Sequence, residues 1–408
     1  MFIADFHLHS KYSRATSRDM DIEHLAVWAK KKGVDLLGTA DFTHPDWLRE
    51  LKEKLEETEY GIYRHKDTLF VLTVEVSNIY FKTGKTRKIH NVIFAPSVRI
   101  AEEINKLLSR YGSLYSDGRP ILSIECDKMV KALNKIDNDI FVVPAHVWTP
   151  HFGVFGANSG FDSIEECFED MTPNIYALET GLSSDPAMNW RWSSLDRFSL
   201  ISNSDAHSPS RIGREANVFK EKFGYKELIK ILKEKDKDKF LYTIEFYPQE
   251  GKYHWDGHRK CGARLSPEEA ENLRYRCPKC GGKITVGVMH RVAKLGDRKK
   301  DFVLEGAHSY KSLIPLAEII ASVIGMGPET QGVQREYNNL ISRFGNEIKI
   351  LLEISGDGLL KECPERIAEG ILNAREGRVD IVPGYDGVYG KVSVHKEPEK
   401  KEKQPELF

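Results

Sequence analysis

The stretch Phe2-Ile3-Ala4-Asp5-Phe6-His7-Leu8-His9 decides the fold of the first half of the chain. Its apolar start, residues 2–4, predicts a buried strand that ends at Asp5. Residues two apart in an extended chain project to the same side, so His7 and His9 can bind one metal ion. A His-x-His pair alone does not define a site, and the remaining ligands must come from elsewhere in the chain.

Strand-like and helix-like segments alternate from this stretch to about residue 245. Helical spacing appears at residues 22–32, with Asp21 as a cap, and at 45–57. The later strand-like runs are residues 34–39, 69–74, 89–95, 140–143, 175–178 and 200–202. This alternation predicts a parallel sheet, either open or closed into a barrel.

Candidate metal ligands stand beside nearly every predicted strand. They are His7 and His9, Asp41 or the nearby His44, Glu75, His90, His146, and Asp205 with His207. In barrel enzymes, reacting groups from the ends of several strands converge on one face. The sequence therefore favours a closed barrel over an open sheet.

The chemistry of these ligands indicates more than one metal ion. The set contains only imidazoles and carboxylates, and it is larger than the three or so protein ligands that one catalytic zinc needs. Two or three ions of zinc, manganese, magnesium or iron would use it. Clustered ions are typical of phosphoester hydrolysis. The predicted catalytic residues are His7, His9, Glu75, Asp205 and His207.

The amino-acid composition restricts how the protein can bind nucleic acid and indicates the cellular compartment in which it works. The chain has 408 residues, with 60 Lys+Arg against 61 Asp+Glu and a net charge of −1, so any nucleic acid must be held by local basic patches or by metal ions. No apolar run reaches membrane-spanning length and no signal peptide is evident. Six cysteines, three of them clustered, suggest a reducing compartment. We expect a cytoplasmic protein without a membrane partner.

The clustered cysteines form a second metal motif. His258-x-x-Cys261 is followed by Cys277-Pro278-Lys279-Cys280, and this pairing predicts a structural zinc ribbon, with His254 as a competing nitrogen ligand. Basic residues interleaved with aromatic ones around it are typical of DNA contacts. The predicted DNA-binding residues are Arg259, Arg274, Arg276, Lys279, Arg291, Lys294, Arg298 and Lys299.

The rest of the chain is mainly helical. Helical spacing appears at residues 314–324, 332–344, 348–354 and 364–376, separated by glycine-rich turns that include 325–328 and 355–358. We therefore expect four parts: a phosphoesterase barrel at 1–247, a zinc module at 248–291, a helical DNA-binding domain at 292–394, and a flexible tail at 395–408.

Two resemblances sharpen this interpretation. His7-x-His9-Ser10, Thr39-Ala40-Asp41, Glu75, His90, His146 and Asp205-Ala206-His207 resemble the polymerase-and-histidinol-phosphatase (PHP) domain. That resemblance implies a distorted seven-stranded (β/α) barrel with a multinuclear metal site. The chain departs from the family at Asp41, where a histidine is usual, and at Ser13-Arg14, where an acidic ligand is usual.

The barrel motifs, the zinc motif and the helical region together resemble the endonuclease Q family over nearly the whole chain. This likeness implies a DNA-repair endonuclease that cuts on the 5′ side of uracil, hypoxanthine, xanthine or an abasic site. The tail residues Gln404, Leu407 and Phe408 resemble a shortened sliding-clamp-binding peptide, which would make the clamp a second partner.

Two rival functions use the same residues. A PHP-type phosphatase acting on a small phosphoester would use the same metals but would not need the basic zinc module. A non-catalytic DNA-binding accessory protein would be expected to have lost metal ligands, and this chain keeps them.

Overall fold

The computed structural model describes residues 1–394, which form two compact units. The first unit contains Met1–Leu313 and Val382–Lys391, and the second contains Ile314–Ile381 and the residues from Val392 onward. The chain therefore leaves the first unit, returns to it for one short segment and leaves again. Among residues 1–394, no helix has both the length and the apolar character needed to span a membrane.

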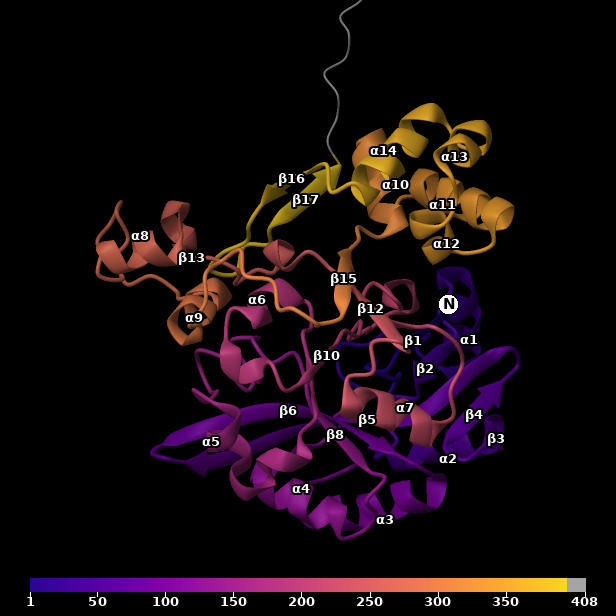
Figure 1. Ribbon diagram of the computed structural model, residues 1–408, viewed down its shortest axis with the longest axis vertical. Helices are drawn as coiled ribbons and strands as arrows, with labels where there is room; N and C mark the ends of the chain where they lie inside the picture. The colour runs from indigo at the N-terminus through magenta and orange to yellow at the C-terminus, as the bar shows by residue number, and fades with distance from the viewer. Residues whose placement is uncertain (395–408) are drawn as a thin grey trace, which may run out of the picture. The chain divides into compact units, whose positions relative to one another are not determined.

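A mixed sheet of eleven strands is the frame of the first unit (Figure 1). Its strands are β1 (Phe2–Asp5), β2 (Leu36–Gly38), β3 (Glu56–Glu59), β4 (Ile62–His65), β5 (Thr68–Lys82), β6 (Lys85–Ala95), β7 (Ile121–Leu122), β8 (Phe141–Pro144), β11 (Ala216–Phe219), β12 (Phe240–Glu245) and β15 (Ser309–Ser312). The main path is β15-β12-β11-β1-β2-β5-β4-β3, with β6 and β7 attached to β5, and β8 attached to β6.

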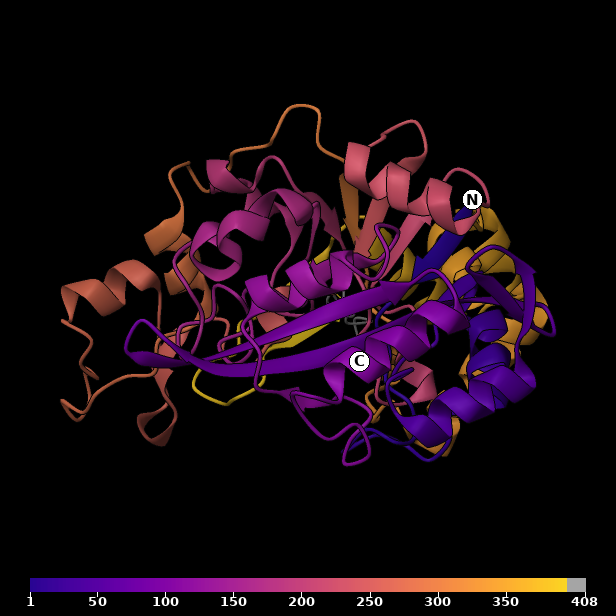
Figure 2. The ribbon, with the colours of Figure 1, turned by 90° about the horizontal axis from the view of Figure 1, so that it is seen from below.

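The prediction of an all-parallel sheet is wrong in part. Strands β1, β2 and β5 are parallel neighbours, but β5 and β6 form a long antiparallel hairpin whose arms run side by side in Figure 2. Only Thr83 and Gly84 join them, with φ of 52° and 76°. A two-residue turn with positive φ closes a hairpin and cannot cross over to a parallel strand. Glu75 and His90 consequently lie inside strands, not at strand ends.

A parallel pair, β9 (Ala177–Glu179) and β10 (Ser199–Ile201), stands apart from the large sheet in hydrogen bonding. It nevertheless contacts two places on that sheet. Val147, just after β8, donates to the Glu179 carbonyl at 3.1 Å. Ser202, just after β10, donates its N–H to Asn217 Oδ1 at 3.0 Å and its hydroxyl to the Ile244 carbonyl at 2.8 Å. The pair thereby bridges the β8 side and the β11–β12 side.

Helices cover the sheet. They are α1 (Ile22–Lys32), α2 (Pro45–Lys54), α3 (Val98–Leu108), α4 (Cys126–Asn134), α5 (Ile164–Phe168), α6 (Pro186–Trp190) and α7 (Tyr225–Glu234). As predicted, Asp21 caps α1 by accepting the His24 N–H, and Gly33 ends the helix in the left-handed region. Helix α7 buries Leu228, Ile231 and Leu232 in the cluster that contains the sheet's phenylalanines. This apolar face fixes α7 against the sheet.

The zinc-motif region is a small appendage within the first unit. It contains β13 (Asp256–His258), β14 (Ala263–Leu265), α8 (Pro267–Asn272) and α9 (Val288–Leu295). The returning segment Val382–Lys391 holds it in place: Asp386 accepts the Arg259 N–H and the Thr285 hydroxyl, and the Gly384 carbonyl accepts the Trp255 N–H.

The second unit is mainly helical, as predicted. It contains α10 (Leu316–Ile324), α11 (Gln331–Phe344), α12 (Glu347–Leu352), α13 (Gly356–Glu362) and α14 (Glu365–Arg375), with the paired strands β16 (Val379–Val382) and β17 (Lys391–Val394) at its border. Residues 355–358, predicted as a turn, instead start α13. Ser355 caps this helix by accepting the Gly358 N–H, which outweighs the low helix propensity of the glycines.

Gly38, at the end of β2, lies where neighbouring segments pack too closely to leave room for a side chain. A Cβ there would lie 2.2 Å from the Phe6 carbonyl oxygen and 2.4 Å from Thr73 Oγ1. We expect Gly38→Ala to lower the free energy of unfolding by about 1–3 kcal/mol because this core cannot expand freely. The measurement is urea unfolding followed by tryptophan fluorescence, since all tryptophans lie in the first unit. Val27→Ala, on the exposed face of α1, is the control, and equal stabilities would contradict the prediction.

Candidate active site and zinc site

Two histidine-bearing segments are held side by side at the end of β1. The buried Asp5 carboxylate accepts the N–H groups of Ser204 and Gly213, each at 3.0 Å. The His9 N–H donates to the Ala206 carbonyl at 3.0 Å. These bonds align the segment after β1 with the segment after β10. His7 and His9 are consequently brought next to Asp205 and His207, as the sequence predicted.

Glu75, inside β5, lies at the centre of the site. Three sets of side chains each bring their ligand atoms within 4.8 Å of one another, and Glu75 belongs to two of them. The sets are His7, His9 and Glu75; His9, Asp205 and His207; and Glu75, His90 and His146. Glu75 Oε2 lies 3.3 Å from His9 Nε2, and its Oε1 lies 2.9 Å from His146 Nε2. The shared residues make this one continuous buried cluster.

The cluster has the features of a metal site. His7 Nε2, His9 Nε2 and Asp205 Oδ1 are buried and have no hydrogen-bond partner within residues 1–394. Unpaired buried polar atoms cost free energy, and these three point at one another. Neutral imidazole and carboxylate ligands without thiolates suit zinc, manganese, iron or magnesium. The residues therefore fit a multi-metal site.

Backbone strain is concentrated at the same place. Asp41, His146 and Asp205 have φ of 41°, 32° and 47°. Non-glycine residues rarely adopt the left-handed region, and such strain clusters at functional sites. These conformations occur at three of the predicted ligands, each of which follows a strand within a few residues, where the chain turns away from the sheet.

The charges of the site are strongly coupled. Burial alone would raise the pKa of Glu75, but the neighbouring His90, His7 and Arg119 hold it well below its usual range. Burial lowers the pKa of His90 to about 4, although Glu75 opposes this shift. Asp205 is partly buried, and desolvation would raise its pKa, but His9 and His7 lower it. Burial would lower the pKa of His7, His9 and His146, but the surrounding carboxylates raise it, so a metal ion must displace a proton from each of these imidazoles in order to bind it.

Asp41 and His44, the two alternatives for one ligand position, differ in their surroundings. Asp41 Oδ1 is 3.5 Å from His9 Nδ1, while its Oδ2 accepts bonds from Ser10 and Ser13. The His44 ring stacks on Tyr12 with centroids 4.4 Å apart. Neither residue belongs to the three sets found in the described part of the chain. Asp41 therefore contacts the nitrogen of His9 that faces away from Glu75 and Asp205.

Two residues of the site were missed by the sequence analysis. The Glu179 carboxylate, at the end of β9, lies 3.0 Å from His7 Nδ1 and accepts the His146 N–H at 2.8 Å. Glu179 ends a predicted strand, so the strand-end rule could have found it. Arg119 donates to Glu75 Oε2 at 2.9 Å, but it lies on a loop without any periodic signal.

The zinc motif forms a compact ligand set. His258, Cys261, Cys277 and Cys280 bring their ligand atoms within 4.8 Å of one another, whereas His254 is not part of this set. Desolvation would raise the pKa of Cys277, but the N–H groups of Lys279 and Cys280 and the His258 side chain lower it to about 6. A thiolate at neutral pH favours zinc.

The predicted DNA-binding residues fall into two groups. Arg259, Arg274, Arg276, Lys279, Lys294 and Lys299 are exposed. The Arg291 guanidinium is buried and donates to the Phe155 and Phe161 carbonyls and to Asp162. Arg298 forms a bidentate ion pair with the Asp196 carboxylate. These two arginines fasten α9 and the loop after it to the body of the first unit, so we leave them out of the proposed DNA surface.

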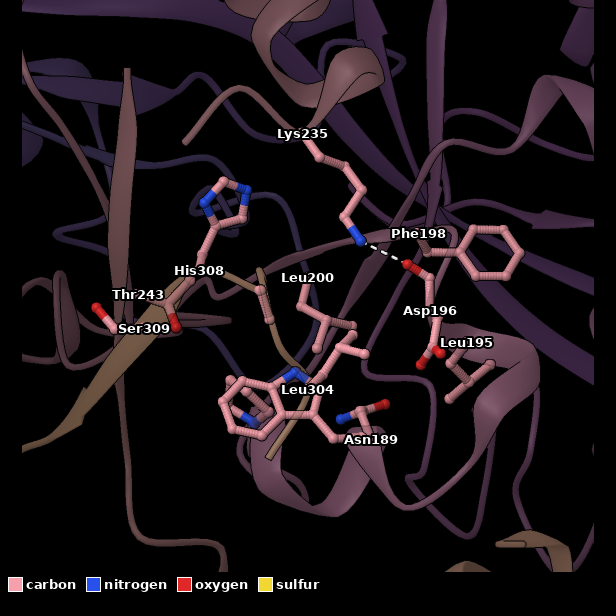
Figure 3. A pocket seen from close by; sticks show the side chains of 13 residues that line it. Asn189, Leu195, Asp196, Phe198, Leu200, Lys235, Thr243, Leu304, His308 and Ser309 are labelled. Atoms are coloured by element: carbon pink, nitrogen blue, oxygen red, sulfur yellow. Dashed lines mark hydrogen bonds between the residues drawn. The ribbon is translucent and has the colours of Figure 1, made fainter. Parts of the chain in front are cut away.

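A hollow of about 320 Å³ opens beside the cluster. Residues just after His146 and Glu179 form one wall, including Thr149, His151 and Ser183, and Tyr253, His254 and Tyr389 form another. The hollow drawn in Figure 3 is different: among the polar groups that line it are Lys235, hydrogen-bonded to the Asp196 carbonyl, and His308 across the opening. At about 20 Å³ it has room only for water-sized molecules.

Comparison with known proteins agrees with this geometry. The chain is 31% identical to the lesion-specific endonuclease PfuEndoQ of Pyrococcus furiosus, and the two structures match with a TM-score of 0.87 over 97% of this chain and 96% of that one. The chain belongs to the endonuclease Q family. An endonuclease Q structure in complex with a 27-mer duplex carrying an abasic lesion at its active site matches with a TM-score of 0.86 and 31% identity, over 97% of each chain.

Two further relatives of this endonuclease Q family member bear the name uncharacterized protein. Uncharacterized protein YqxK of Bacillus subtilis is 28% identical over 95% of this chain and 98% of its own. Uncharacterized protein MJ0043 of Methanocaldococcus jannaschii is 34% identical over 74% of this chain, which spans only about a third (36%) of that protein's length. Residues 315–378, in the helical unit, match the family model of the MJ0043 C-terminal domain.

The substitution Glu179→Gln tests whether Glu179 orients the predicted metal ligand His7. Because Glu179 orients His7 through its outer nitrogen, we expect the amide to weaken Mn²⁺ binding about 10- to 100-fold. The measurement is calorimetric titration of the metal-free protein. Glu165→Gln, on an exposed position of α5, is the matched control. An unchanged affinity would show that Glu179 has no role in holding the site.

Cys277→Ser tests the zinc ribbon. We expect loss of one tightly bound zinc per chain by elemental analysis and a lower melting temperature, because the small cluster of Ala263, Leu265, Ala270 and Ile284 cannot stabilise this region alone. Cys363→Ser, in the helical unit, should leave the zinc content unchanged. Zinc retained in Cys277→Ser would argue against this ligand set.

Proposed function

We propose that the protein is a metal-dependent DNA repair endonuclease. It hydrolyses the phosphodiester bond on the 5′ side of a deaminated base (uracil, hypoxanthine or xanthine) or of an abasic site. The observation that carries this proposal is the buried ligand cluster centred on Glu75, in a chain that matches a lesion-specific endonuclease over nearly its whole length.

The residues of the cluster have separate tasks in this proposal. His7, His9, Glu75, Asp205 and His207, with His90, His146 and Asp41, hold two or three divalent ions. Such ions would provide hydroxide from water and neutralise the charge of the phosphate oxygens. Glu179 keeps His7 in the orientation in which its Nε2 faces the cluster. Burial of the cluster keeps competing water away from the ligands.

The fold proposed for the cluster is a distorted barrel. The contacts of β9 and β10 with both sides of the large sheet support this closure. We further propose that the four predicted parts divide the work: the barrel cuts, while the zinc module and the helical domain bind DNA. The exposed Arg259, Arg274, Arg276, Lys279, Lys294 and Lys299 contact phosphates. The clamp-binding residues Gln404, Leu407 and Phe408 lie outside the described residues.

We assign the extruded nucleotide to the 320 Å³ hollow. An enzyme that acts at one damaged base in a duplex must take that base out of the stack. The Tyr253 and Tyr389 rings line this hollow, and stacking on aromatic rings tolerates any base. His254 also lines this hollow, and burial lowers its pKa to about 4, so the residue adds a neutral imidazole to the hollow.

The activity is tested on end-labelled duplexes carrying deoxyuridine, deoxyinosine or an abasic site, with Mn²⁺ or Mg²⁺. We expect one nick on the 5′ side of each lesion and none in undamaged DNA. Asp205→Ala should lower the rate at least about 100-fold because it removes a metal ligand. Asp67→Ala, whose side chain is 87% exposed, should cut like the wild type.

Two outcomes would replace this function. Hydrolysis of small phosphoesters without DNA cleavage would support the PHP-type phosphatase. Tight DNA binding without any hydrolysis would support the accessory protein.

The base hollow is tested by comparing two lesions. Tyr253→Ala should lower cleavage at uracil about fivefold or more, because a stacking contact is lost. Cleavage at an abasic site should stay nearly unchanged, because that lesion has no base to stack. Tyr60→Ala, at a distant exposed tyrosine, is the control. Equal losses on both lesions would place the Tyr253 effect outside base recognition.

A further inference from the structure

The loop between α3 and β7, residues 111–120, is pinned over the metal cluster. The Gly118 N–H donates to the Tyr12 carbonyl at 3.0 Å, and the Pro120 carbonyl accepts the Ser77 N–H at 2.9 Å. Asp117 accepts the N–H groups of Arg14 and Arg119, each at 3.2 Å. These contacts tie the loop to the segment after β1 and to β5.

Gly118 brings the loop closer to the ligands than any other residue could. A Cβ at this position would lie 2.2 Å from Asp41 Oδ2 and 2.5 Å from Ser13 Oγ. The backbone therefore lies directly against a predicted metal ligand. This contact fixes the position of the next residue, Arg119.

Arg119 presents a cation at the cluster. Its guanidinium donates to Glu75 Oε2, and 28% of the side chain remains exposed. The same Oε2 atom faces His7 and His9. A divalent ion held by Glu75 would compete with Arg119 for this oxygen. The Arg119 guanidinium, a planar group with five N–H donors, would then be available to a phosphate bound at the cluster.

Tyr115 presents an aromatic ring from the same loop. The neighbouring Leu114 is buried, so the loop is anchored here, yet Tyr115 is 72% exposed. Its ring meets His44 edge-on with centroids 6.4 Å apart, and His44 in turn stacks on Tyr12. A ring held outward by packed neighbours loses little freedom when a base stacks on it.

We propose that residues 111–120 are a second DNA-contact element, in which Arg119 binds the scissile phosphate and Tyr115 stacks on a nearby base of the cleaved strand. This inference rests on the proposed endonuclease function. The two side chains stand four positions apart, so at most about 14 Å of chain separates them, which is about four stacked nucleotides. One strand can therefore contact both.

The Arg119 contact is tested by DNA binding in Ca²⁺, a divalent ion that carboxylates bind but that is a poor source of hydroxide at neutral pH, so that Glu75 is occupied and cleavage is suppressed. The probe is a fluorescein-labelled duplex with one abasic site, titrated at several salt concentrations. Arg119→Gln should reduce the slope of log K against log salt by about 1, because one phosphate contact is lost. Arg119→Lys should keep the slope and bind more weakly, since it lacks the planar fork. Arg49→Gln, on the outer face of α2, should match the wild type.

A second measurement distinguishes two roles of Arg119: binding a phosphate, and holding the Glu75 carboxylate in place. If Arg119 competes with metal, Arg119→Gln should bind Mn²⁺ at least as tightly as the wild type does. Weaker Mn²⁺ binding with an unchanged salt slope would overturn the proposal and leave Arg119 a purely structural role.

The proposed Tyr115 contact predicts a loss of DNA affinity that does not depend on salt concentration, unlike the loss expected for Arg119. Tyr115→Ala should weaken binding of the same duplex by about fivefold or more without changing the salt slope, and Tyr115→Phe should bind like the wild type. Tyr60→Ala is the control. If the wild-type protein cuts lesion DNA but Tyr115→Ala and Arg119→Gln bind like their controls, this inference alone is overturned. If the wild type does not bind the duplex, the proposed function falls with it.

Discussion

The first unit depends on how Glu75 is kept ionised while almost wholly buried. Only 1% of this residue is exposed, and removing a lone carboxylate from water costs several kcal/mol. His7, His9, His90, His146 and Arg119 surround it. They come from four segments of the chain: His7 and His9 follow β1, His90 lies in β6, His146 follows β8, and Arg119 lies in the loop before β7. The fold must therefore bring distant segments to one point. Asp5, Asn203 and Glu179 hold those segments with further hydrogen bonds.

The sequence predicts this site well where a ligand follows a strand. That rule located His7, His9, Asp41, His146 and Asp205, and it would also have located Glu179. The sequence also selected Glu75 and His90 as ligands, and both belong to the cluster. Only their position was wrong, because the short Thr83-Gly84 turn was not recognised: they lie inside the β5–β6 hairpin. The rule could not locate Arg119, since tertiary contacts alone place an irregular loop over the cluster.

The zinc ligands could be predicted from local sequence, whereas the roles of the basic residues depend on tertiary contacts. Cysteine spacing is a local property, so four ligands could be identified from sequence, and the choice of His258 over His254 needed only the fold of one hairpin. The role of a basic side chain depends on what lies opposite it. Arg291 and Arg298 look like their exposed neighbours in sequence, but carbonyl groups and carboxylates elsewhere in the first unit bind them.

The returning segment Val382–Lys391 has a consequence for biosynthesis. Chains fold from their N-terminal end as they leave the ribosome. The partners of Trp255, Arg259 and Thr285 on this segment emerge only after the whole helical unit has been made. While residues 314–381 are being synthesised, the zinc module of the nascent chain therefore lacks these hydrogen bonds. The zinc module is thus completed last although it is encoded earlier, and a truncation within the helical unit removes contacts of a module that precedes it in the sequence.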